Sequence, residues 1–69
     1  MEINGITYTL SGINFQFATL VGDWVSFNFS LSTGINYAFV LQGQEASDLY
    51  KDGLTDENIY KQLQKNLGG

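Results

Sequence analysis

Two runs of alternating apolar and polar residues lie back to back in the middle of this chain and constrain its fold more than any other feature. The first run covers residues 24–31 and the second covers residues 35–42, with a short glycine-containing segment between them. Alternation with a period of two indicates a strand with one buried face. Two such strands around a short turn indicate a β-hairpin.

The turn of this hairpin, Ser32-Thr33-Gly34, predicts which side chains face one another across the two strands. A three-residue loop that ends in a left-handed glycine is a common hairpin connection, the G1 bulge. We therefore expect four apolar pairs on one face of the sheet. They are Leu31 with Ile35, Phe29 with Tyr37, Phe27 with Phe39, and Val25 with Leu41.

Residues 3–17 predict another hairpin. Asn4-Gly5 is a turn or bulge signal, because both residues tolerate positive φ. Either one strand spans residues 3–10 with a bulge at Gly5, or the strand begins at Ile6. A two-residue turn at Ser11-Gly12 would then place the apolar residues on either side of it on one face. The expected pairs are Leu10 with Ile13, Tyr8 with Phe15, and Ile6 with Phe17.

The connection between the two hairpins is centred on Gly22-Asp23. A two-residue loop there would put the apolar residues of the joined strands on opposite faces, so we expect a loop of three residues. If Trp24 belongs to the loop, each cross-strand pair shifts by two residues relative to a loop that includes Val21. With Val21 in the loop, the pairs are Phe17 with Phe27, Phe15 with Phe29, and Ile13 with Leu31.

The end of the chain predicts an α-helix over residues 55–67. Thr55 is a suitable N-cap, and the acids after it suit the positive end of the helix dipole. Gly68 is a typical residue just beyond a helix end. Apolar side chains recur every fourth residue and form one stripe. They are Ile59, Leu63 and Leu67, with Tyr60 beside them.

The segment before this helix, residues 43–54, is interpreted as a connector. Within it, the stretch from Glu45 to Lys51 suits one or two helical turns, which Asp52-Gly53 would end. The predicted fold class is therefore α+β: a four-stranded antiparallel β-meander followed by a C-terminal α-helix packed on one sheet face (ββββα). We expect the 69 residues to form a single small domain, with the sheet in residues 3–42.

The residue types that most catalytic and metal sites need are absent from the sequence. The chain has no Cys and no His, which excludes disulfides, thiolate metal sites and the commonest general base. Several acids lie close together, but without the spacing of a calcium-binding loop. They are Asp48, Asp52, Asp56 and Glu57. We expect a protein that is not an enzyme and that holds no metal or cofactor.

The balance of charge limits the class of partner. Seven acids against three basic residues, all of them lysines, give a net charge of −4. Binding to a nucleic-acid backbone or to an anionic membrane requires clustered Lys or Arg, so we expect neither. The sequence contains no signal-peptide pattern and no apolar run long enough to cross a bilayer. These features predict a cytoplasmic protein.

The sheet face opposite the predicted core is poor in charge, and we identify a candidate interface on it. Tryptophan is enriched at interface hot spots and charge is depleted at interface centres. The alternative is that Trp24 folds over a sheet edge and the face is only hydrated. Residues 35–42 also carry no charge, and at a sheet edge their free backbone groups can pair with a second copy or with a partner's strand. The candidate interface residues are Leu20, Trp24, Ala38 and Val40.

The leading functional hypothesis is a non-catalytic protein-binding domain that self-associates as a homodimer or a larger assembly. One alternative is a small acidic inhibitor that blocks a basic site on another protein, and a second is a domain that sequesters a small molecule between sheet and helix. The opening nine residues, E-I-N-G-I-T-Y-T-L, resemble the strand starts of many small phage and mobile-element proteins. This generic hairpin motif implies no particular function or site.

Overall fold

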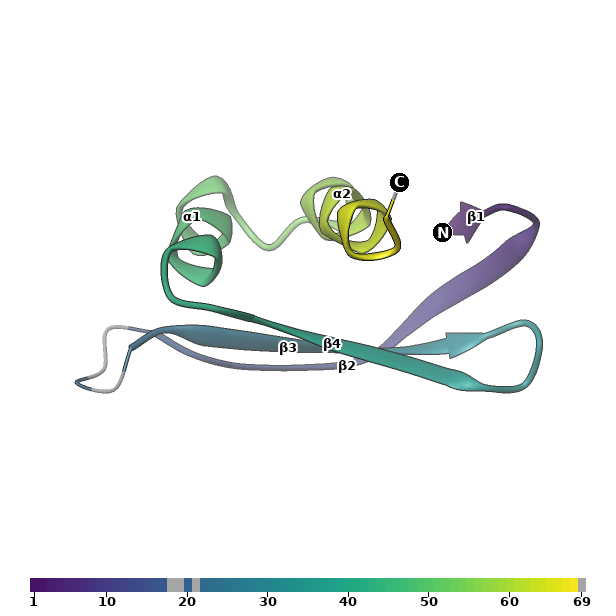
Figure 1. Ribbon diagram of the computed structural model, residues 1–69, viewed down its shortest axis with the longest axis horizontal. Helices are drawn as coiled ribbons and strands as arrows, with labels where there is room; N and C mark the ends of the chain where they lie inside the picture. Colours follow the sequence, from purple (N-terminus) through teal and green to yellow (C-terminus); the bar gives the residue numbers. More distant parts are fainter. Residues whose placement is uncertain (18–19, 21, 69) are drawn as a thin grey trace.

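A computed structural model of the chain describes residues 1–17, 20 and 22–68. Four strands form one antiparallel sheet in the order β1-β2-β3-β4, and two helices cover one of its faces (Figure 1). The α+β class and the four-stranded antiparallel sheet are confirmed, but two helices are present where one was predicted. The elements are β1 (Glu2–Ile3), β2 (Ile6–Gln16), β3 (Trp24–Leu31), β4 (Asn36–Gln42), α1 (Gln44–Asp52) and α2 (Asp56–Asn66).

The first hairpin joins β1 to β2 through Asn4 and Gly5. Both residues have positive φ, 54° and 80° respectively, as the two central positions of a type I′ turn require. Ile3 pairs with Ile6 directly across this turn. Of the two alternatives for the start of the chain, the one in which a strand begins at Ile6 is correct. Figure 1 shows this end of β2 rising from the plane of the sheet on the side where the helices lie, with β1 turning back toward α2.

The predicted turn at Ser11-Gly12 is wrong, because β2 continues through both residues. The register with β3 shifts between Leu10 and Gly12, which marks a bulge at Ser11. A bulge adds one residue to one strand and thereby reverses which residues point to each face. Leu10 and Ile13 therefore share a face without a turn between them. None of the three pairs predicted within residues 6–17 forms, since β2 pairs with β1 and β3 instead.

The connection from β2 to β3 is longer than predicted. Phe15 pairs with Val25, Ile13 pairs with Phe27, and Gln16 pairs with Trp24, which leaves residues 17–23 between the strands. Both versions of the three-residue loop are therefore wrong, and so are the pairs that they imply. Trp24 belongs to β3, whereas Val21 lies outside the described residues. The apolar residues of the two strands still share a face, which was the physical reason for rejecting a two-residue loop.

The hairpin between β3 and β4 is confirmed. Phe29 pairs with Tyr37, Phe27 with Phe39, and Val25 with Leu41. The N–H of Leu31 donates to the carbonyl of Ile35 at 2.9 Å, although β4 itself begins one residue later, at Asn36. Gly34 has a φ of 93°, in keeping with the left-handed position that closes a three-residue loop.

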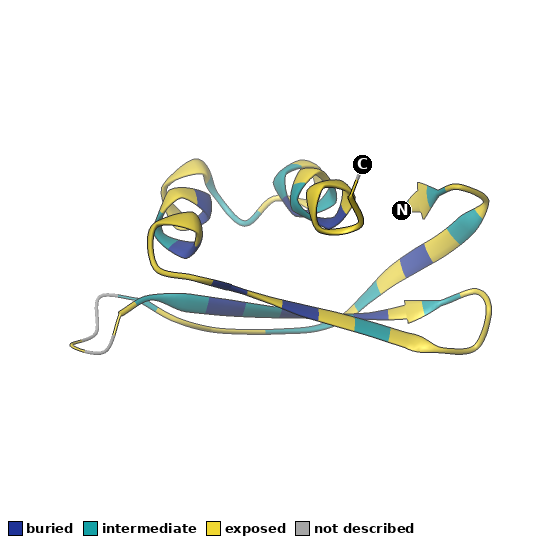
Figure 2. Ribbon diagram, viewed as in Figure 1, coloured by how far each residue is buried: buried dark blue, intermediate teal, exposed yellow. Residues whose placement is uncertain are grey.

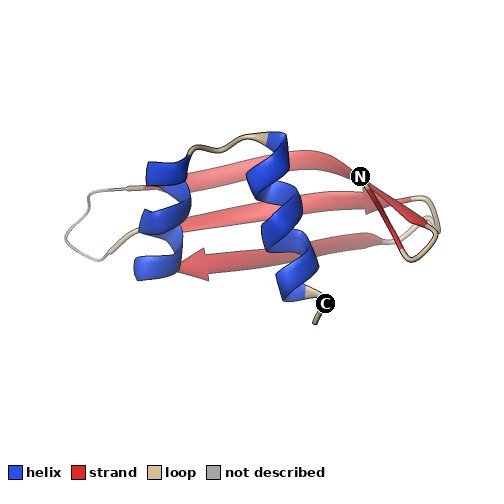
Figure 3. Cartoon of the chain, turned by 90° about the horizontal axis from the view of Figure 1, so that it is seen from above, coloured by secondary structure: helices blue, strands red, loops and turns tan. Residues whose placement is uncertain are grey.

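The two helices cross the strands and lie on the same side of the sheet (Figure 3). In α2, Thr55 caps the N-terminus by accepting a hydrogen bond from the N–H of Asn58 at 3.2 Å. Gly68 follows the helix with a φ of 85°, as predicted. The helical turns expected between Glu45 and Lys51 form the longer helix α1, which ends at Gly53. The segment interpreted as a connector therefore contributes two buried residues, Ala46 and Leu49, to the core.

The core lies between the sheet and the two helices (Figure 2). Phe27, Phe29, Val25 and Leu63 are the largest side chains that are fully buried. The rings of Phe27 and Phe39 lie with their centroids 5.2 Å apart, within the range of favourable aromatic contacts. The buried hydrophobic residues are Tyr8, Val25, Phe27, Phe29, Phe39, Leu41, Ala46, Leu49, Ile59 and Leu63.

Candidate functional site

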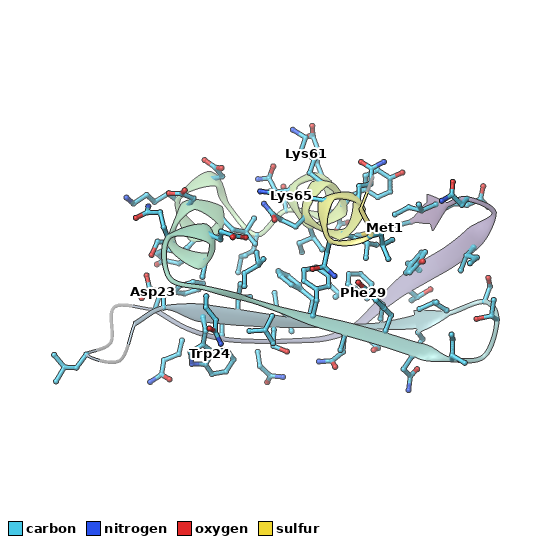
Figure 4. The ribbon with its side chains drawn as sticks, in the orientation of Figure 1. Met1, Asp23, Trp24, Phe29, Lys61 and Lys65 are labelled. Atoms are coloured by element: carbon cyan, nitrogen blue, oxygen red, sulfur yellow. The ribbon has the colours of Figure 1, made fainter. Side chains whose placement is uncertain are left out.

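One face of the sheet is left uncovered, because both helices pack on the other face (Figures 1 and 4). The direct cross-strand pairs on this open face include Gln16 with Trp24 and Ser26 with Val40. On this face the described residues of β2, β3 and β4 carry no charge, whereas the three lysines and five of the seven acids lie in α1 and α2. The open-face residues of the three long strands are Thr7, Thr9, Gly12, Asn14, Gln16, Trp24, Ser26, Asn28, Ser30, Asn36, Ala38, Val40 and Gln42.

Three of the four predicted interface residues come together on this face. Ala38 and Val40 are two residues apart on β4, and both are exposed. Trp24 pairs with Gln42, which makes Trp24 the diagonal neighbour of Val40. Leu20 is fully exposed in the connection between β2 and β3, and no contact recorded for the described residues joins it to the other three.

The side chain of Trp24 is held by a residue of the neighbouring strand β2. Its indole Nε1–H donates a hydrogen bond to Oε1 of Gln16 at 3.1 Å, and the side chain is half-buried. Figure 4 shows Trp24 on the side of the sheet away from Lys61 and Lys65. A surface hollow of about 430 Å³ adjoins it, lined by Gly22, Asp23, Trp24, Gln42 and Gly43.

The free edge of β4 is the second part of the candidate site. β4 is the last strand of the sheet, and its ladder with β3 is anchored at both ends. Ile35 accepts from the N–H of Leu31, and Gly43 donates to the carbonyl of Asp23. In an antiparallel ladder, successive residues direct their backbone groups to alternate sides. The backbone N–H and C=O groups of Tyr37, Phe39 and Leu41 are therefore hydrogen-bonded to β3.

The other residues of β4, which alternate with Tyr37, Phe39 and Leu41, direct their N–H and C=O groups away from the sheet. No strand and no side chain among the described residues pairs with these groups. The strand is seven residues long, without charge or proline, and its register with β3 has no irregularity. The outward-facing residues, which we call the β4 edge, are Asn36, Ala38, Val40 and Gln42.

The opposite edge of the sheet is covered or interrupted along the first half of β2. At the start of β2, the short strand β1 covers the outer side, and Tyr8 exchanges backbone hydrogen bonds with Met1 at 2.6 and 3.0 Å. Farther along, the bulge at Ser11 interrupts the strand, and Ser11 bonds inward to the carbonyl of Asn28. Terminal cover and bulges are both common means of preventing edge-to-edge pairing. The two edges of this sheet therefore differ. On β2 only residues 12–16 are regular and lack a covering strand among the described residues, whereas β4 is regular and uncovered over all seven of its residues.

Charged residues flank the β4 edge on the helix side. A hollow of about 220 Å³ above Leu41 is lined by residues from the start of α1 and the end of α2, among them Glu45 and Lys65. Neither of these two forms an ion pair with another described residue. Nearer the start of β4, the side chain of Asn66 donates a hydrogen bond to the hydroxyl of Tyr37. The end of α2 is thereby held over the edge strand.

The clustered acids belong to the helix layer. Asp48 and Asp52 lie in α1, and Asp56 and Glu57 form the first turn of α2. All four are exposed, and Asp48 accepts a hydrogen bond from Gln44 at 2.7 Å. Within the described residues, no group of three or more acids is arranged to hold a metal ion.

An exposed row of aromatic rings was not predicted. Phe15 was expected in the core, yet it is 53% exposed. Its ring stacks on Phe17 at 5.3 Å, and Phe17 stacks on Tyr50 of α1 at 4.3 Å. The row was not predicted because Phe15 was expected to lie inside a hairpin that does not form.

Comparisons with known proteins give no match for this chain, whether with protein-family models, with curated proteins or with solved structures. In the described part of the chain, neither helix has the length and apolar character needed to span a membrane.

Proposed function

We propose that this chain is a non-catalytic protein-binding domain that self-associates through the β4 edge. The observation that carries the proposal is the contrast between the two edges of the sheet. The first half of β2 has a covering strand and a bulge, whereas β4 is regular and uncharged over all seven of its residues. An edge of this kind is a template for another strand. We further propose a cytoplasmic location.

The chemistry of the open face favours pairing along the edge over stacking of two faces. Most open-face side chains are hydroxyls or amides, and burying such a group without a hydrogen-bond partner costs free energy. Stacking two copies of this face would bury many of these polar groups, and the only apolar side chains buried in return would be Trp24, Ala38 and Val40. Pairing along β4 instead supplies partners for backbone groups that lack them. It also leaves the polar face in contact with water.

A second candidate function is a small acidic inhibitor of another protein, which the distribution of charge supports. Five of the seven acids lie in the helix layer and are exposed, so a basic partner would meet the helices and not the sheet. The acids are Glu45, Asp48, Asp52, Asp56 and Glu57. This candidate becomes the preferred one if the chain is monomeric.

Sedimentation velocity over a range of concentrations tests the proposal. We expect a homodimer or larger assembly at micromolar concentrations, and Ala38→Pro should shift it to the monomer. The N–H of Ala38 points outward, so proline removes a donor from the edge without removing a hydrogen bond to β3.

Trp24→Ala is the matched variant on the open face. Edge pairing predicts that Trp24→Ala retains the assembly, whereas face stacking predicts that it breaks the assembly and that Ala38→Pro does not. Thermal unfolding of both variants verifies that each one is folded. A wild-type monomer at high concentration would contradict self-association altogether.

A further inference from the structure

We propose that the occupant of the β4 edge is a second copy of this chain, with the two β4 strands antiparallel around a two-fold axis at Phe39. This inference rests on the proposed function and specifies its geometry. In such a pair the outward-facing residues of one copy exchange hydrogen bonds with those of the other. The same surface serves both partners, which is the usual arrangement in a homodimer.

The length of β4 selects this register among the symmetric ones. With the axis at Phe39, Asn36 faces Gln42 of the second copy and Ala38 faces its Val40. Because the strand runs from residue 36 to residue 42, all four outward-facing residues of each copy then have a partner. Moving the axis to Ala38 leaves Gln42 without a strand residue opposite it. Moving the axis to Val40 leaves Asn36 without one. The central register therefore makes the most hydrogen bonds.

The side chains along the pair are compatible with close approach. On the open face, Ala38 lies opposite Val40, and neither is charged or long. On the helix side, Tyr37 lies opposite Leu41, while the two Phe39 side chains meet at the axis. Phe39 is 7% exposed and packs against Phe27, so most of its surface is already within the core of its own copy.

The same symmetry brings opposite charges of the two copies toward one another, in addition to the hollow that Glu45 and Lys65 line together within each copy. Glu45 lies in the first turn of α1, near Leu41, whereas the end of α2 is tied to Tyr37 through Asn66. Because Leu41 of one copy faces Tyr37 of the other, Glu45 approaches the end of α2 that carries Lys65 in the partner. The two-fold axis repeats this opposite-charge contact. Both Glu45 and Lys65 lack an ion-pair partner among the described residues of one copy.

The arrangement joins two sheets into one and places both helix layers on the same side. The open faces then form one continuous uncharged surface around the paired β4 strands. Face stacking would bury this surface, so the two modes of association differ in what the assembly leaves exposed.

Cysteine cross-linking tests the register, since the chain has no native Cys. Ala38→Cys and Val40→Cys are made as separate variants, oxidised mildly alone and as an equimolar mixture, and analysed without reductant. Residues in a hydrogen-bonded antiparallel pair have Cα atoms about 5.5 Å apart, within reach of a disulfide. We expect covalent dimers in the mixture and few in either single variant, because residues 38 and 38 of the two copies are only diagonal neighbours.

Other outcomes separate this inference from the function on which it rests. Efficient cross-linking of Ala38→Cys alone would place the axis at residue 38, and efficient cross-linking of Val40→Cys alone would place it at residue 40. Either result would overturn the register and retain edge pairing. An assembly seen in sedimentation with no cross-linking in any sample would overturn pairing along β4. Variants and wild type that sediment as monomers would overturn the proposed function itself.

Discussion

Gly5 and Gly12 each follow a short polar residue, but only Gly5 has a backbone conformation that favours glycine. Its φ is 80°, and it completes the turn between β1 and β2. Gly12 lies within β2, where an added Cβ would meet only Asn28 atoms at 3.9 Å, an ordinary contact. Substituting alanine at each position therefore tests whether that glycine lies in a turn or in a strand.

We predict that Gly5→Ala lowers the free energy of unfolding by about 1–2 kcal/mol, the cost of a left-handed conformation for a residue with a Cβ. Gly12→Ala should be close to neutral, since alanine fits an extended strand. Urea unfolding of both variants measures the difference. A greater loss of stability for Gly12→Ala would contradict the continuous strand β2 and favour a turn at Ser11-Gly12.

The sequence pattern alone does not separate these two possibilities. Leu10 and Ile13 are three residues apart and both apolar, which fits a two-residue turn and a bulge equally well. Asn-Gly, however, suits a type I′ turn at both positions, whereas Ser-Gly suits it at only one. The bulge is favoured because Leu10 pairs with Phe29 and Ile13 pairs with Phe27, which are contacts between residues far apart in the sequence. Local patterns do not encode those contacts.

At the scale of the element, α2 was the most predictable part of the chain. Its N-cap, apolar stripe and terminal glycine all lie in one short stretch, so the helix from Asp56 to Asn66 agrees closely with the predicted one. For α1 the signal was weaker, because its buried residues are only Ala46 and Leu49. The open face and the placement of Trp24, Ala38 and Val40 on it followed from alternation. Leu20 did not follow, since the connection from residue 17 to residue 23 was longer than predicted.

The docking of α2 on the sheet gives a prediction for neighbouring positions. Leu63 is fully buried, whereas Gln64 is exposed. Leu63→Asp should unfold the domain or lower its stability by several kcal/mol, because it buries a charge without a partner. Gln64→Asp adds the same charge one residue later and should cost little. Circular dichroism melts compare the two, and equal melting temperatures would contradict the packing of α2 on the sheet.

At the scale of the whole molecule, the two sides of the sheet differ in chemistry. The helix side carries the three lysines and most of the acids, while the open side has hydroxyls, amides and one tryptophan. A domain of this size with no disulfide draws only about 3–5 kcal/mol from a single core. Association along the β4 edge would add to that stability and make it depend on concentration. Pairing along the β4 edge would thus compensate for the small core and leave the open face in contact with water.

Amide hydrogen exchange, resolved by residue at low and at high protein concentration, tests pairing along the β4 edge most directly. In the monomer, the amides of Tyr37, Phe39 and Leu41 bond β3 and should exchange slowly, while those of the β4 edge should exchange quickly. At high concentration we predict that the β4-edge amides become protected as well. The outward amides of β2, at Ile13 and Phe15, should continue to exchange quickly. Fast exchange of the β4-edge amides at every concentration, or new protection at Ile13 and Phe15 alone, would contradict the account.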